Sequence, residues 1–158
     1  MEAEMASERA AELAHRLREV AADLIALVEP IDDGHWRHVP HPGVWSIGKD
    51  AEHVAEATLY HQWIVRLTIG EKVSSRRPAI ERKEVTTRLA PQEMVELIHL
   101  RTEDGARLLA GLTDEQLSVT TRPPRARGAL LAETIEGVLI GHYDGHREAI
   151  EAKLRALA

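Results

Sequence analysis

Two histidines near the carboxyl end of the chain, His142 and His146, have the type and spacing that most clearly suggest chemistry. They stand four residues apart in a segment of helical apolar periodicity, so we expect both on one helical face, in line with Val138 and Ile150. Imidazoles one turn apart can bind a single metal ion, as in other helical metal sites. The pair alone favours a metal only weakly, because buried histidines are often hydrogen-bonded core residues. A third donor from another helix would strengthen the hypothesis.

The candidates for a third donor are His53 and His61, which lie in an earlier helical segment. They are separated by about two helical turns and cannot readily share one ion, so the pattern leaves either open. A further group, His35, His38 and His41, follows no helical face in a segment broken by prolines. We interpret this group as solvated loop histidines and not as a second metal cluster.

Composition excludes several classes of protein. The 158 residues suggest one domain, spanning 1–158 with a frayed stretch at 1–6, and the net charge of −6 argues against a nucleic-acid partner. The absence of cysteine removes disulfides, thiolate ligands and a thiol nucleophile, so thiol chemistry would need a thiol from outside. With no apolar run long enough for a bilayer and no signal-peptide pattern, we expect a cytoplasmic protein without a membrane partner.

The chemistry-bearing histidines must be positioned by helices, and apolar stripes predict four long ones, at 7–28, 46–70, 91–112 and 129–156. Ser46 is the expected N-cap of the second, preceded by Trp45. Arg101 and Gly105 interrupt the stripe of the third. We expect a loop at 31–44 and a short capped turn at 113–117. The charged segment 71–90 shows no stripe and is long enough to cross the bundle, which leaves the second and third helices parallel.

Two further features suggest contacts with other molecules. Gly137, Gly141 and Gly145 fall on one ridge of the last helix, where each costs about 0.5–1 kcal/mol relative to alanine. This spacing suggests close approach of another helix, within the bundle or in a second subunit, and we favour a homodimer. A loop at 118–128 contains three arginines, for which a solvated linker is the simpler interpretation and an anion-binding edge the sharper one. These are Arg122, Arg125 and Arg127.

Trp45-Ser46 at a helix start, His53 seven residues after that serine, a crossover, and a late His142-x-x-x-His146 together resemble the DinB-like (DinB/YfiT) superfamily over essentially the whole chain. The resemblance implies an all-α, up-down-down-up four-helix bundle. It also implies a divalent metal, zinc or nickel, held by His53, His142 and His146, which decides between His53 and His61.

Three imidazole ligands would leave the ion with an open position, as in catalytic sites. A water bound there would have its pKa lowered toward 7, and a thiol would lose its proton and become a nucleophile. The resemblance therefore suggests a hydrolase or an S-transferase that uses an external low-molecular-weight thiol, acting on a small molecule. The alternatives are a non-catalytic dimeric metal-binding or stress-response bundle, and a helical interaction module without metal.

Carboxylates close to the histidines in sequence are candidates for orienting the rings, because a carboxylate that accepts the far N–H of a ligand fixes its tautomer. Tyr60 and Tyr143 are candidates for lining a pocket. The carboxylates are Asp50, Glu56, Asp144 and Glu148.

Overall fold

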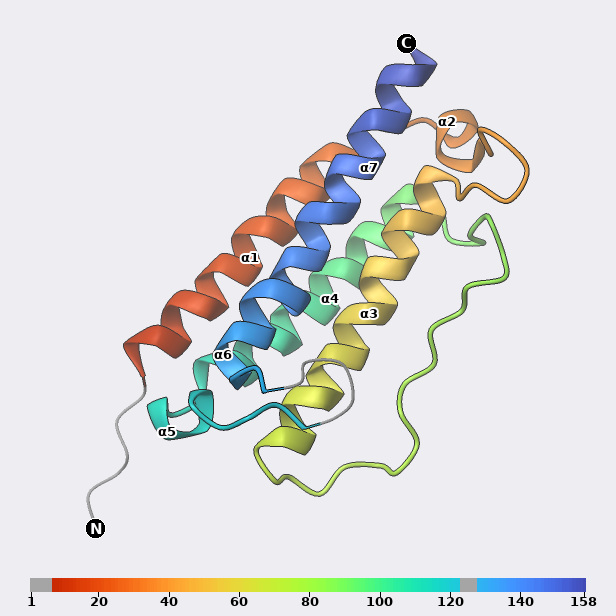
Figure 1. Ribbon diagram of the computed structural model, residues 1–158. Coiled ribbons are helices and arrows are strands. Elements are labelled where there is room, and N and C mark those ends of the chain that lie inside the picture. The colour runs from red at the N-terminus through yellow and green to blue at the C-terminus, as the bar shows by residue number, and fades with distance from the viewer. Residues whose placement is uncertain (1–6, 123–127) are drawn as a thin grey trace.

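The computed structural model describes residues 7–122 and 128–158 and is an up-down-down-up four-helix bundle (Figure 1). Its long helices are α1 (Glu8–Val28), α3 (Ile47–Thr68), α4 (Pro91–Ala110) and a final rod that ends in α7 (Gly141–Leu157). In Figure 1, α1 and α7 run in one direction, whereas α3 and α4 run in the other. The predicted all-α class is confirmed, because the described residues contain no strand.

The helices begin where the sequence predicts. The Ser7 and Ser46 hydroxyls accept hydrogen bonds from the amides of Ala10 and Lys49, each at 3.1 Å, and satisfy free N–H groups of the first turns. Pro91 occupies the first turn of α4, and α5 (Asp114–Leu117) is the capped turn predicted at 113–117. Buried leucine, isoleucine, valine and alanine side chains of all four rods then form one core.

The connection between α3 and α4 crosses the bundle and leaves these helices parallel, as predicted (Figure 1). It is attached to the bundle along its length. Trp63 Nε1 donates to the Ser74 carbonyl at 2.9 Å, and the Ser46 amide donates to the Val85 carbonyl at 2.8 Å. Near its end, Trp36 Nε1 donates to the Leu89 carbonyl at 2.9 Å. We call residues 71–90 the crossover.

The predicted loop at 31–44 is wrong in one part, because it contains α2 (Asp33–Arg37). The Asp32 carboxylate caps this helix by accepting the His35 amide at 2.9 Å, and Trp36 is fully buried. Five residues are too short to show an apolar period, so the pattern gave no signal.

The final rod also differs from the single regular helix predicted at 129–156. It begins with α6 (Leu131–Thr134), continues as a π-helical turn, η1 (Ile135–Ile140), and then becomes α7. A π-turn holds more residues than an α-turn and shifts the buried face. Val138 is therefore 40% exposed, while Leu139, Ile140 and Tyr143 are buried. His142 and His146 lie at the edge of the core and not in the middle of its stripe.

The glycine ridge makes no close helix contact within the bundle, because a Cβ at Gly137 or Gly145 would meet nothing within 4 Å. Close packing occurs elsewhere. Gly105, which the sequence suggested would interrupt the face of α4, is buried, and a Cβ there would lie 3.2 Å from Leu17 Cδ2. A Cβ at Gly48 would lie 2.8 Å from the Trp36 ring. A role for the ridge in a homodimer stays a prediction.

The crowded site at Gly48 and the open site at Gly145 predict opposite effects of an alanine substitution on the free energy of unfolding. Gly48→Ala should lower the free energy of unfolding by about 1–3 kcal/mol, because the new methyl overlaps Trp36 and Thr87. Gly145→Ala, on an open face of α7, should raise it by about 0.5–1 kcal/mol by removing the entropic cost of a helical glycine. Urea denaturation of metal-free protein checks both, and equal shifts for the two variants would contradict the packing described for α3.

Candidate metal centre

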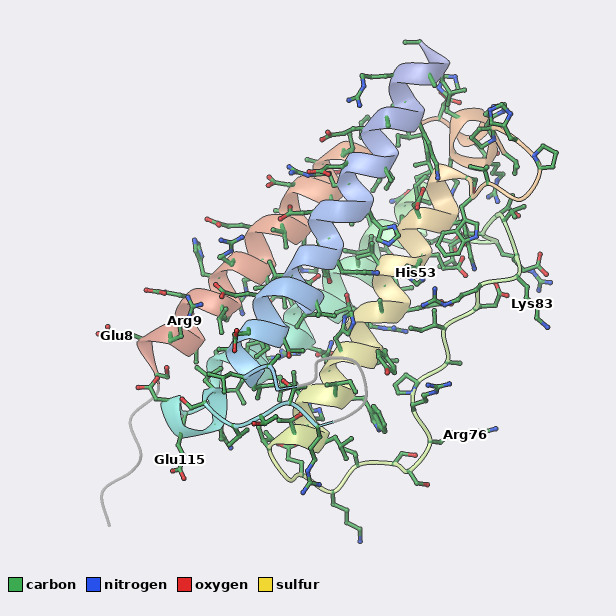
Figure 2. The ribbon with its side chains drawn as sticks, viewed as in Figure 1. Glu8, Arg9, His53, Arg76, Lys83 and Glu115 are labelled. Atoms are coloured by element: carbon green, nitrogen blue, oxygen red, sulfur yellow. The ribbon has the colours of Figure 1, made fainter. Side chains whose placement is uncertain are left out.

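Three histidines from two helices converge between α3 and α7. His53 is on the second turn of α3, and His142 and His146 are one turn apart at the start of α7. One ring nitrogen from each lies within 4.8 Å of those of the other two, and the ring centroids are 4.5–5.0 Å apart. We call these residues the triad; Figure 2 shows His53 in the space between the two helices. Among the described residues, no other group of histidines and carboxylates converges in this way.

The triad has the chemical state that a metal site requires. Burial is the main cause that lowers the pKa of His53 to about 4 and that of His142 to about 3. The guanidinium of Arg82 lowers both pKa values further. The rings of His53 and His142 are therefore neutral at pH 7, with lone pairs available to a cation. Nδ1 of His53 and Nδ1 of His142 are buried and accept no hydrogen bond from the described residues, so a cation fits this donor set.

The third ring is oriented by a carboxylate on the opposite helix. Nδ1 of His146 lies 3.1 Å from Oδ1 of Asp50, which is only 4% exposed. A carboxylate accepts hydrogen bonds, so Nδ1 carries the proton and Nε2 keeps its lone pair. The other Asp50 oxygen accepts a hydrogen bond from the Lys153 ammonium of α7. From its place in the first turn of α3, Asp50 therefore contacts two residues of α7.

The other carboxylates considered from the sequence do not contact the triad. Glu56 accepts the Glu81 amide at 3.0 Å, and its own burial raises its pKa. Asp144 lies 3.5 Å from the Arg147 guanidinium. Glu148 is exposed on α7 and makes no hydrogen bond to a ring of the triad. Of the four, the structure brings Asp50 alone into contact with a ring.

A cavity of about 630 Å³ opens beside the triad. His53 and His142 form part of its wall, and His61 lies next to them with its ring centroid 5.7 Å from that of His142. Tyr60 lines the cavity, but Tyr143 does not. The Tyr143 hydroxyl is buried in the core, 2.6 Å from Thr58 Oγ1 and 3.1 Å from Thr102 Oγ1. The volume suits a small molecule.

Of the three arginines in the loop at 118–128, the structure describes Arg122, which lies apart from this cavity. Arg122 is exposed, and its backbone amide donates to Thr68 Oγ1 at 3.1 Å, near the far end of α3. Its side chain is not part of the cavity wall. Arg125 and Arg127 lie outside the described residues.

Several residues around the triad gave no signal in the sequence. The Trp45 ring lies 5.1 Å from that of His53, and the Lys49 ammonium lies over the Trp45 ring, 5.7 Å from its centroid. Lys49 is fully buried and reaches Glu81 of the crossover, with Nζ 2.7 Å from Oε2. Arg82 lines the cavity. A charged residue in a helix or loop is normally solvated, so only the three-dimensional contact reveals these roles.

Replacing Asp50 should weaken metal binding without removing a donor of the triad. Asp50→Asn removes the charge that fixes the His146 ring, so we expect zinc affinity to fall about 10–100-fold. Asp144→Asn is the matched control, because Asp144 is equally near the histidine pair in sequence but contacts Arg147. Competition with a chromophoric chelator measures both constants. Equal losses in the two variants would contradict the role given to Asp50.

The neutral state of the buried rings predicts a pH dependence of stability in metal-free protein. The unfolded chain binds protons near the ordinary histidine pKa of 6.5, whereas folded His53 and His142 bind them only near pH 4 and 3. Stability should therefore be complete above pH 6.5 and fall as the pH is lowered below it, by at most about 1.4 kcal/mol per pH unit for each ring.

Urea denaturation at pH 7 and pH 5 with a chelator present measures this dependence. His142→Gln should lose part of it, because its ring no longer titrates. His15→Gln should keep it, because His15 is 72% exposed on α1. A wild-type stability that does not change between these pH values would contradict the assignment.

Comparison with known proteins agrees with this fold. Residues 16–150 match the family model of the DinB superfamily. The structure is similar to that of YfiT from Bacillus subtilis, described as a probable metal-dependent hydrolase with an unusual four-helix bundle topology. The TM-score is 0.76 at 22% sequence identity, and the match covers 99% of this chain and 93% of that one. The curated proteins give no match. No described helix is long and apolar enough to cross a membrane. On the family match, this chain belongs to the DinB superfamily.

Proposed function

We propose that this chain is a metal-dependent enzyme, in the first place a hydrolase, that acts on a small molecule in the cavity beside the triad. The observation that carries the proposal is the convergence of three ring nitrogens within 4.8 Å of one another at the wall of a 630 Å³ cavity. The description of the similar YfiT structure as that of a probable metal-dependent hydrolase supports it. An ion with three protein ligands beside a cavity has the arrangement of catalytic metal sites, whereas structural sites are closed by four.

The residues of the chain have distinct roles in this proposal. His53, His142 and His146 hold a divalent ion, and Asp50 fixes the tautomer and orientation of His146. A bound zinc or nickel ion would supply Lewis acidity, which lowers the pKa of a water or thiol that binds it. His61 and Tyr60 are titratable groups on the same wall, placed to pass a proton to or from a reacting molecule.

The same site supports S-transfer from a low-molecular-weight thiol as a second candidate. The chain contains no cysteine, so the thiol must enter from solution, and the cavity is large enough for a small thiol and an electrophile. The non-catalytic metal-binding bundle is the remaining alternative. It requires metal at the triad but no turnover in the cavity.

Metal content and turnover together test the proposal. Protein purified without a polyhistidine tag should contain about one divalent ion per chain, and His142→Ala about 0.1 or less. Wild-type protein should hydrolyse members of a panel of activated esters and amides, and His142→Ala should not exceed background. His15→Ala, on the outside of α1, is the control and should match wild type in both measurements.

Each outcome separates the alternatives. Turnover only when a small thiol and an electrophile are supplied together would identify the transferase. One ion per chain with no turnover in either assay would identify the non-catalytic bundle. Less than about 0.1 ion per chain in wild type, unchanged by His142→Ala, would overturn the proposal, because a folded site of this kind retains its metal.

A further inference from the structure

The wall of the cavity opposite the triad is strongly basic. It is formed by residues of the crossover and includes three arginines, whereas no aspartate or glutamate lines the cavity. This distribution is unexpected in a chain with a net charge of −6. The arginines are Arg76, Arg77 and Arg82.

Two of these arginines have the position to contact a ligand. Figure 2 shows the Arg76 side chain pointing away from the bundle. Arg76 therefore adds positive electrostatic potential to the cavity but is not placed to contact a ligand directly. Arg77 and Arg82 form no ion pair with the described residues. Arg18, Arg37 and Arg66, by contrast, pair with carboxylates at 2.8–3.0 Å. The positive charge of Arg82 also reaches the triad, because it lowers the pKa of both His53 and His142.

The backbone at Arg82 is fixed by the preceding residue. Oε2 of Glu81 lies 2.7 Å from Nζ of Lys49, whose side chain is fully buried, and this ammonium lowers the pKa of the Glu81 carboxyl. The Glu81 carboxylate also accepts the Lys83 amide at 2.6 Å. On the other side, the Glu81 amide donates to Glu56 of α3 at 3.0 Å. We call Lys49, Glu81 and Glu56 the crossover clamp.

The clamp has a consequence for Arg82. Burying a lysine is costly unless its charge is paired, and this pair joins α3 to the middle of the crossover. The backbone next to Arg82 is therefore held in place by both the side chain and the main chain of Glu81, and Arg82 extends from it beside the triad. Free arginine forks in a fixed position recognise planar anions such as carboxylates and phosphates.

We propose that the substrate carries a second, non-reacting anionic group, a carboxylate or a phosphate-like oxyanion, which Arg82 and Arg77 bind while the reacting group faces the triad. This inference rests on the proposed function, since it takes the cavity as the substrate site. It adds the substrate class: small molecules with at least one anionic group a few bonds from the reacting centre. The clamp residues Lys49 and Glu81 act as positioning residues for Arg82.

Binding of a matched pair of probes tests the proposal. Succinate carries two carboxylates, and succinamate is nearly the same shape with one carboxylate replaced by an amide. Calorimetric titration at low ionic strength should show that zinc-loaded wild type binds succinate about tenfold more tightly than succinamate, the factor expected of one charge-assisted hydrogen-bond pair. In Arg82→Gln this preference should fall to about twofold or less.

Lys83→Gln is the matched control. It removes the same charge from the next residue, but Lys83 points into solvent in Figure 2 and does not line the cavity. It should keep the preference for succinate. Zinc content should be the same in all three proteins, which shows that the variants do not act through the triad.

The same titrations on metal-free protein separate this proposal from the proposed function. A succinate preference that depends on Arg82 in metal-free protein supports the anion site even if zinc does not bind the triad. Absence of zinc binding would overturn the proposed function and leave the anion site supported. No preference in wild type, or equal losses in Arg82→Gln and Lys83→Gln, would overturn the anion site whatever the zinc content.

Discussion

The geometry of the site depends on the buried carboxylate of Asp50, which joins α3 to α7. One oxygen contacts Nδ1 of His146, and the other contacts Lys153 two turns further along α7. Two contacts on the same helix fix both the rotation of α7 and its position along its axis relative to α3. His53, one turn after Asp50 on α3, then faces His142 and His146 across the interface. Without the contacts of Asp50, little would hold three imidazoles from two antiparallel helices close together, because neutral rings attract one another only weakly.

The chain combines burial and positive charge around the triad, and these act in the same direction. Desolvation disfavours the charged form of an imidazole, and nearby cations disfavour it further. The lowered pKa values of His53 and His142 follow, and both rings are neutral at pH 7. Neutral nitrogen donors add no negative charge, so a divalent ion held by them keeps its full attraction for anions. A ligand that enters from solution must supply the compensating charge, which agrees with an anionic substrate.

Sequence reasoning located the long helices, two of their caps and the parallel pair, because apolar stripes, capping residues and the length of a connection are local signals. It placed His142 and His146 in the core, whereas the π-turn η1 shifts the face and leaves both at the edge of the core. Periodicity alone could not choose between His53 and His61, since it gives the face of a helix but not the rotation of its neighbour; the resemblance made that choice. Nothing in the pattern indicated Lys49 or Arg82, because a contact between a helix and a twenty-residue crossover has no period.

The topology explains why the crossover, and not one of the four rods, forms the wall of the cavity that contains the arginines. Parallel α3 and α4 need a connection that returns over the full length of α3, and His53 lies in the N-terminal half of that helix. The crossover must therefore pass the end of α3 that carries His53. Its side chains can change without altering the apolar stripes that hold the four rods together, provided that a few anchors such as Glu81 remain. The four rods thus determine which ring nitrogens converge. The crossover determines which charged side chains line the cavity. Under the two proposals, substrate preference and metal binding would be separable, because the arginines lie on the crossover and the triad lies on α3 and α7.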